Sequence, residues 1–186
     1  MRALLLHMMV SVDGFTQGPG GVMDWIEIDD PDFHEYLAAL LDSVDGQIFG
    51  RVCYEELAQY WPQAEREPAA PGDELAPRVN GLPKYVVSHR RHELPWQPAV
   101  RIGADLAEEV AELKARPGKP LVLFGGATTA QEFLRLGLVD ELWLAVFPVL
   151  LGLGQRFFAP GPRSELRLLE TREFPKSGVV LQRYRR

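Results

Sequence analysis

The architecture of this chain is read most directly from Leu121-Val122-Leu123-Phe124-Gly125-Gly126-Ala127-Thr128-Thr129. A continuous apolar run of this kind is typical of a strand that is buried on both faces of a parallel sheet. Two glycines follow at once, and the residues up to Gly137 then have the pattern of a helix. The segment therefore predicts a strand, a tight glycine turn and a helix, which is the repeating unit of an α/β sheet.

The same alternation recurs towards the amino terminus. Residues 1–10 predict a first strand, and Asp30-Pro31 predicts the start of a helix, with Asp30 as N-cap and Pro31 as first helical residue. Further strands are expected at 47–49, 84–88, 99–102 and 121–124, and further helices after Gly50, Asp105 and Gly126. The expected strands at 142–149, 165–174 and 178–184 have no helices between them. Residues 62–83 contain several prolines and predict an exposed loop.

This order of elements indicates the fold class. Strands that alternate with helices imply a parallel sheet with crossover helices, and the closing strands imply an antiparallel edge. We therefore expect a three-layer α/β fold with a mixed, mostly parallel central sheet and antiparallel carboxy-terminal strands, in a single domain covering residues 1–186. In such sheets ligands bind beyond the carboxyl ends of the strands.

Composition excludes several classes of protein. The chain has 186 residues, a formal charge of −6 and one cysteine. A single cysteine excludes an intramolecular disulfide and Cys-based metal cages, and we expect no metal site. The acidic balance argues against nucleic acid and anionic membranes as partners. No apolar run is long enough to cross a bilayer, so we expect a soluble, cytoplasmic protein that acts on a small molecule.

Three predicted strands end in segments suited to phosphate. Residues 125–128 place glycines at a helix start, where backbone N–H groups and the helix dipole favour an anion. Gly50-Arg51 adds a cation to a second helix start, and Ser88-His89-Arg90-Arg91 ends a strand with a hydroxyl and basic groups. Taken singly, these segments also fit a tight turn, a solvated arginine and a solvated turn. Together they favour a dinucleotide that carries an extra 2′-phosphate.

Seven short motifs then point to a family. In order they are Ser11-Val12-Asp13-Gly14-Phe15, Asp24-Trp25, Gly50-Arg51 with Tyr54-Glu55, Lys84-Tyr85-Val86-Val87-Ser88, Gly125-Gly126-Ala127, Val139-Asp140-Glu141-Leu142 and Pro148-Val149-Leu150-Leu151-Gly152-Leu153-Gly154. With them the chain resembles, over nearly its whole length, the dihydrofolate reductase-like superfamily. Within it the chain is most similar to the carboxy-terminal reductase domain of the bifunctional riboflavin-biosynthesis deaminase-reductase. The resemblance implies an NADPH-dependent reductase, commonly a homodimer; residues 142–153 fit either a subunit interface or a core strand.

The resemblance also implies roles for individual residues. Those expected to bind NADPH are Gly50 and Arg51 at the adenosine-side phosphates, Ser88 and His89 at the 2′-phosphate, and Gly125, Gly126, Ala127 and Thr128 at the pyrophosphate. Trp25 corresponds to a tryptophan beside the nicotinamide and the substrate, and residues 14–23 to a mobile loop that closes over them. The chain departs from its relatives at two positions. Cys53 stands where a cofactor-binding threonine is usual, and Phe124 stands where the riboflavin enzymes have a substrate-binding glutamate.

The acid that would supply a proton is less defined. Asp13, Asp24, Glu27 and Asp30 are the candidate carboxylates. Asp30 corresponds to the pterin-binding acid of dihydrofolate reductase but also fits a helix cap, and Asp13 fits a turn determinant. We therefore expect a reductase of a small pterin-like or ribosylaminopyrimidine-like heterocycle, similar to 5-amino-6-(5-phosphoribosylamino)uracil reductase. The alternatives are a nucleotide-binding protein of the same fold without turnover and a true dihydrofolate reductase.

Overall fold

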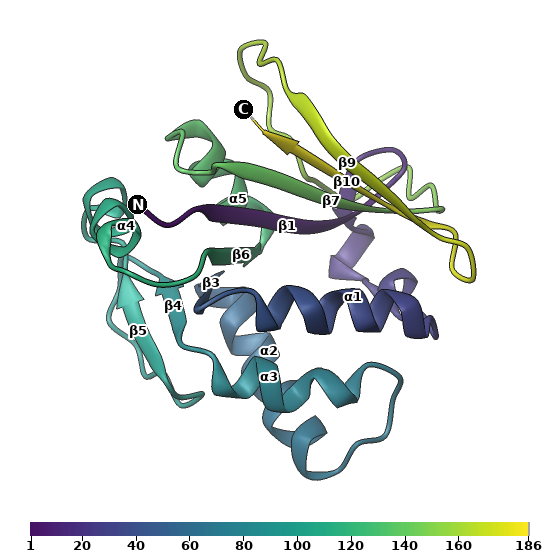
Figure 1. Cartoon of the computed structure of the whole chain (residues 1–186), viewed down its shortest axis with the longest axis horizontal. Coiled ribbons are helices and arrows are strands. Elements are labelled where there is room, and N and C mark those ends of the chain that lie inside the picture. The colour runs from purple at the N-terminus through teal and green to yellow at the C-terminus, as the bar shows by residue number, and fades with distance from the viewer. Residues whose placement is uncertain (186) are drawn as a thin grey trace.

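A central sheet of eight strands organises the molecule (Figure 1). The computed structural model describes residues 1–185, and Arg186, the last residue of the expected domain, lies outside them. Across the sheet the strands are β5 (Ala99–Ile102), β4 (Lys84–Val87), β3 (Gly46–Gly50), β6 (Leu121–Gly125), β1 (Leu4–Ser11), β7 (Glu141–Phe147), β10 (Val179–Arg185) and β9 (Arg167–Phe174). From β5 to β7 the pairs are parallel, whereas β10 is antiparallel to both of its neighbours. The predicted mixed sheet is confirmed.

Helices cover both faces of this sheet, so the three-layer prediction is also confirmed. One face carries α1 (Pro31–Asp42), α2 (Arg51–Arg66) and α3 (Ala76–Gly81), and the other carries α4 (Leu106–Ala115) and α5 (Ala127–Arg135) (Figure 1). Alternate residues of β1 face the two layers, as the pleat of a strand requires. Leu6 and Met8 pack towards α4 and α5, whereas Leu5 packs towards α1. Among residues 1–185, no helix has the length and apolar character needed to span a bilayer.

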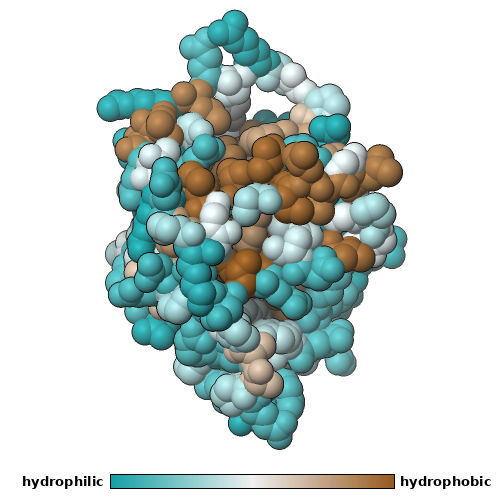
Figure 2. All heavy atoms as spheres, turned by 90° about the vertical axis from the view of Figure 1, so that its right-hand side faces the viewer, coloured by the Kyte–Doolittle hydropathy of each residue, from teal (hydrophilic) through white to brown (hydrophobic). Residues whose placement is uncertain are grey.

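The loop after β1 is tied to the loop after β7. A small second sheet pairs β2 (Phe15–Gln17) with β8 (Gln155–Arg156), and the short 3-10 helices Pro19–Gly21, Asp24–Ile26 and Asp73–Leu75 complete the elements. Figure 2 views the face towards which the carboxyl ends of β1 and β7 point, and apolar side chains gather there. Val12, Leu150 and Leu153 of these loops are exposed. The homodimer stays a prediction.

The expected exposed loop at residues 62–83 is wrong. Helix α2 continues through Pro62 to Arg66, and α3 occupies much of the remainder. Pro77 lies in the first turn of α3, where a missing N–H removes no helical hydrogen bond. The buried side chains of Leu75 and Val79 pack into the core beside α2. The prolines of this segment therefore lie inside a helix (Pro62), at a helix start (Pro77) and in short connections, and they do not mark one irregular loop.

Lys84 is buried where α3 meets β4. Its ammonium group donates hydrogen bonds to the carbonyl oxygens of Asn80 at 2.7 Å and Leu82 at 2.8 Å, near the end of α3. The same group lies 4.5 Å from the centre of the Trp96 ring. Burial lowers the pKa of Lys84 to about 8, because no carboxylate balances its charge.

The Asp30 carboxylate joins two segments that are far apart in the sequence. One carboxylate oxygen accepts from the N–H groups of Asp32 and Phe33, which caps α1, and the other accepts from the N–H of Ser177 at 2.9 Å, in the turn between β9 and β10. Burial alone would raise the pKa of Asp30, but these bonds and the Ser177 side chain outweigh it and leave the pKa lowered. The carboxylate therefore joins the start of the first helix to the last hairpin.

We expect Asp30→Ala to lower the free energy of unfolding by about 2 to 3 kcal/mol, because it removes a cap and leaves the Ser177 N–H without its partner. Asp105→Ala is the matched control, since Asp105 caps α4 through the N–H of Glu108 alone. It should cost about 1 kcal/mol. Urea unfolding measures both values, and equal losses would contradict the dual role of Asp30.

Lys84 should make stability depend on alkaline pH. The folded protein releases the Lys84 proton near pH 8, whereas the unfolded chain holds it to about pH 10.5, so the unfolded state binds more protons between these values and stability rises with pH. From about pH 8 to about pH 10, wild type should gain about 2 kcal/mol relative to Lys84→Met in urea unfolding. Parallel profiles for the two proteins would refute a depressed pKa.

Candidate functional site

The three segments expected to bind phosphate follow three neighbouring strands. In the sheet β4, β3 and β6 lie side by side, with Gly50 opposite Val87 and Phe49 opposite Gly125. Because these strands are parallel, their carboxyl ends meet at one edge. The three segments, which are about forty residues apart in the sequence, therefore lie next to one another along this edge of the sheet.

Two helices start at this edge without a side-chain cap. The N-cap residues of α2 and α5 are Gly50 and Gly126, and neither helix start receives a side-chain hydrogen bond. By contrast, α1 and α4 are capped by Asp30 and Asp105. The first N–H groups of a helix have no partner inside the helix and form a site of partial positive charge. The edge therefore presents two adjacent helix starts that can hold anions.

Glycine lets the two helix starts approach each other. A Cβ atom on Gly50 would overlap the Thr129 hydroxyl in the first turn of α5, and it would lie 3.6 Å from the backbone nitrogen of Gly126. Gly125 has φ of +115°, and a cis peptide bond joins it to Gly126. A Cβ atom on Gly126 would meet nothing within 4 Å, so the space in front of this backbone is open.

The side chains at the edge divide into free and engaged groups. Arg51 is exposed and pairs with Glu55 one helical turn away, at 2.6 Å. His89 is exposed, as are the arginines that follow it. Ser88 is buried, and its hydroxyl is used in its own turn, where it donates to the Arg90 carbonyl and accepts from the Arg90 N–H. Arg51 and His89 are therefore the more available groups.

Cys53 lies in the first turn of α2, but its side chain packs against the core cluster that contains Tyr54 and Trp96. Burial raises the pKa of its thiol to about 12, with a smaller contribution from Glu56. The thiol stays protonated at neutral pH and therefore lacks the reactivity of a thiolate.

A chain of aromatic rings runs beside this edge, on the α1 side of the sheet. Consecutive ring centres are 5.3 to 5.8 Å apart in the order Trp25, Phe147, Phe33, Tyr36, His7 and Phe124. Phe124 also stacks on Phe49 at 6.2 Å. Trp25 and Phe124, the two residues expected at the substrate, therefore belong to one continuous aromatic layer, with four rings between them.

The expected catalytic carboxylates have other contacts. Asp13 accepts from the Ser11 hydroxyl at 2.7 Å and from the N–H groups of Leu151 and Gly152, so it ties together the loops after β1 and β7. The Ser11 hydrogen bond and these N–H groups lower the pKa of Asp13 to about 2. The Asp30 carboxylate caps α1 and accepts from the Ser177 N–H, and Asp24 is exposed. The carboxylates of Asp13 and Asp30 thus hold the fold in their ionised form.

Sequence reasoning missed His7 and Tyr36. Both are buried in the aromatic layer, and neither the Nε2 atom of His7 nor the hydroxyl of Tyr36 has a hydrogen-bond partner among residues 1–185. The signal for His7 was present, because an ionisable residue interrupts an otherwise apolar strand. Tyr36 was hidden because it occupies an apolar position of the α1 face.

Comparison with known proteins places the chain among relatives of the same architecture. The RibD C-terminal domain family matches residues 2–180. The uncharacterized protein YyaP of Bacillus subtilis is 38% identical over 180 residues, which cover 96% of this chain and 92% of YyaP. A candidate riboflavin biosynthesis protein from Shewanella sp. PV-4 is 25% identical, with a TM-score of 0.76 and coverage of 99% and 98%.

The fold extends to a more distant enzyme. Dihydrofolate reductase from Enterococcus faecalis superposes with a TM-score of 0.64 at 13% identity, covering 99% of this chain and 96% of that one. At this identity the likeness concerns the fold, which is that of dihydrofolate reductase. The family match over nearly all of the described residues is the stronger finding: the chain belongs to the RibD C-terminal domain family.

Proposed function

We propose that the protein is an NADPH-dependent reductase of a small heterocycle, as the riboflavin-type reductases of its family are. The observation that carries the proposal is the pair of uncapped helix starts at Gly50 and Gly126, set side by side where β3 and β6 end. Helix starts of this kind bind phosphate through backbone N–H groups and the helix dipole. The Enterococcus faecalis enzyme of the same fold is described in complex with NADP(H).

The residues of the edge fit the phosphate groups of this cofactor. Gly125 to Thr128 would hold the pyrophosphate, and the open space in front of Gly126 leaves room for it. Arg51 would bind the adenosine-side phosphates after leaving Glu55, because an exposed ion pair of this type contributes little free energy. His89, beside Ser88, would contact the 2′-phosphate.

The order of the strands matches the order of groups along the cofactor. Across the sheet β4, β3, β6 and β1 follow one another. The residues proposed for the 2′-phosphate, for the adenosine-side phosphate of the pyrophosphate and for the rest of the pyrophosphate follow the first three of these strands in turn. The nicotinamide would then lie near the end of β1, beside Phe124 and Trp25. A single extended ligand can therefore satisfy all the segments at once.

The protein contributes positioning and exclusion of water. When bound, NADPH supplies the hydride. The Phe124 ring would form an apolar wall for a flat substrate, and the segment 14–23, anchored through Asp13, would cover the nicotinamide and the substrate. Closure of such a segment keeps water from the reacting groups.

A nucleotide-binding protein without turnover is the second candidate. It is favoured by one observation, that Asp13 and Asp30 are ionised and engaged in holding the fold, which makes them poor proton donors. The same observation argues against a true dihydrofolate reductase, because Asp30 has no oxygen free to bind a pterin. A screen of pterins, ribosylaminopyrimidines and small enones for NADPH oxidation separates a reductase from a binding protein, because a protein without turnover oxidises no NADPH with any of them, and the compound that is reduced tells one reductase from another.

Arg51→Ala should weaken NADPH binding about tenfold or more, because a charge-assisted hydrogen bond to phosphate is lost. The measurement is a titration of NADPH followed by nicotinamide fluorescence. Arg78→Ala is the matched control, since Arg78 is also exposed and ion-paired, to Asp42, but lies in α3 and pairs with the last residue of α1. Its affinity should equal that of wild type. Equal affinities for all three proteins would remove Arg51 from the site, and no binding at millimolar NADPH or NADH would refute the proposed function.

His89→Ala should weaken NADPH binding about threefold to tenfold and leave NADH binding unchanged, because only NADPH carries the 2′-phosphate. Ser88→Ala should disturb the turn that its hydroxyl holds, and so weaken NADPH binding through the displacement of His89. The ratio of the two dissociation constants, measured by the same titration, is the readout. If His89→Ala weakens NADPH binding and NADH binding by the same factor, His89 lies outside the 2′-phosphate site.

A further inference from the structure

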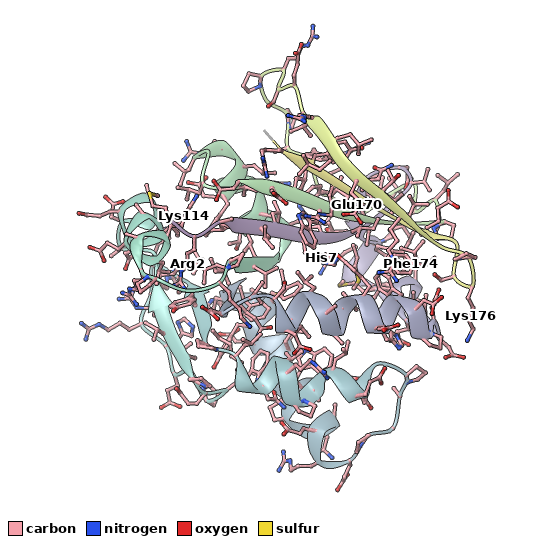
Figure 3. The ribbon with its side chains drawn as sticks, viewed as in Figure 1. Arg2, His7, Lys114, Glu170, Phe174 and Lys176 are labelled. Carbon is pink, nitrogen blue, oxygen red and sulfur yellow. The ribbon has the colours of Figure 1, made fainter. Side chains whose placement is uncertain are left out.

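Two buried side chains in the aromatic layer have polar atoms without partners. Among residues 1–185, five buried side-chain nitrogen or oxygen atoms lack a hydrogen bond, and three of them belong to the aromatic chain: His7 Nε2, Tyr36 OH and Trp25 Nε1. His7 is 2% exposed and Tyr36 is 7% exposed, and their ring centres are 5.8 Å apart. Figure 3 shows His7 projecting from β1 towards α1. His7 and Tyr36 are therefore neighbours, and the centre of the His7 ring also lies 5.6 Å from that of the Phe124 ring.

Buried polar groups without partners require an explanation. A nitrogen or hydroxyl that leaves water without a new hydrogen bond costs free energy, and native proteins contain few such groups. Phenylalanine at position 36 and an apolar residue at position 7 would fill the same layer without this cost. The packing around Phe33 and Phe174 needs only the ring of Tyr36, not its hydroxyl. The two polar atoms are therefore available to hydrogen-bond a ligand or a water molecule.

The pair is uncharged at neutral pH. Burial lowers the pKa of His7 to about 4, so its ring is neutral. Burial also raises the pKa of Tyr36, with Glu170 adding to the rise and Arg183 and Arg172 opposing it, so its hydroxyl stays protonated. These three charged residues come from β9 and β10, and Arg172 lies 6.0 Å from the centre of the Tyr36 ring. The pair thus offers a neutral imidazole and a neutral phenol.

The Asp30 carboxylate does not add a hydrogen-bonding group to the His7–Tyr36 pair. Asp30 uses one oxygen to cap α1 and the other to bind Ser177, so it adds no free acceptor to the layer. Phe124 brings an apolar ring to the place where the glutamate of the riboflavin reductases would stand. Among residues 1–185, the side chain with an unpartnered polar atom in ring contact with Phe124 is that of His7, and Tyr36 lies next to His7.

We propose that His7 and Tyr36 are the specificity-determining pair of the substrate site, which bind the uncharged lactam edge of a flat heterocycle held between aromatic rings. The lactam offers an N–H and a carbonyl oxygen side by side, and a neutral imidazole and a phenol can pair with such groups. A ring with a charge at this edge would meet no opposite charge from the pair. This inference rests on the proposed reductase function, because that function places the substrate beside Phe124.

The test uses lumazine, a flat pteridinedione with two lactam N–H groups, as the probe. Its dissociation constant is measured by calorimetry with saturating NADP⁺ present, so that no hydride can be transferred. Tyr36→Phe and His7→Gln should each weaken lumazine binding about tenfold, the loss of one buried hydrogen bond. Tyr184→Phe is the matched control, since Tyr184 bonds to Gln182 and packs on the α4 and α5 side of the sheet. It should bind lumazine as wild type does.

Two further readouts separate binding from structure. The melting temperature of Tyr36→Phe should equal or exceed that of wild type, whereas a structural role for the hydroxyl would lower it. 1,3-Dimethyllumazine, which lacks both N–H groups, should bind wild type more weakly than lumazine does, and Tyr36→Phe should not weaken it further.

Each outcome of these measurements supports or refutes the proposed role of His7 and Tyr36. The His7–Tyr36 proposal is refuted if lumazine binds wild type and all variants equally. It is also refuted if wild type binds NADPH but not lumazine, and that result leaves the cofactor proposal intact. Lumazine binding that depends on Tyr36 in a protein that binds no NADPH or NADP⁺ would support the pair and overturn the reductase.

Discussion

The contact between the end of β3 and the first turn of α5 is the constraint on which the rest of the site depends. Gly50 has no side chain, so β3 can end against Thr129 and Gly126 without a clash. This approach sets the start of α2 beside the start of α5 and aligns both with the edge of the sheet. A side chain at this position would push the two helix starts apart. The anion-binding character of the edge follows from this close packing, because the fields of the two helix starts then add.

The distribution of carboxylates reinforces this arrangement. Asp30 and Asp105 cap α1 and α4, which leaves the starts of these helices satisfied. The helices that start at Gly50 and Gly126 have no such cap, so their N–H groups remain for a ligand or solvent. An acidic protein with a charge of −6 would repel a phosphorylated cofactor if its carboxylates faced the edge. Asp30 and Asp105 are used as caps, and the Glu55 carboxylate near the start of α2 is paired with Arg51, which removes part of this conflict.

The sequence predicted the sheet and the glycine turns that end β3 and β6 because these rest on local signals. The apolar run into Gly125-Gly126 and the cap at Asp30 determine their own neighbourhoods. It mispredicted residues 62–83, because burial of Leu75 and Val79 overrides the tendency of nearby prolines to break helices. It also missed the partnership of His7 and Tyr36, which lie on a strand and a helix that meet only in the folded protein. Contacts of this kind depend on tertiary packing, and the local sequence around one of the two residues does not indicate the other.

The edge also carries a gradient of charge that would give the cofactor one orientation. Exposed Arg51 and the basic residues after Ser88 lie where β3 and β4 end, whereas neutral rings lie beside Phe124 and β1. A ligand bound in reverse would place its phosphates among aromatic rings, where no cation or helix start would replace the lost water. Its neutral ring would lie among cations that gain nothing from it. Under the proposed function, the strand order would thus select the position of the ligand and its direction, and the uncharged end of the row would be left for the substrate.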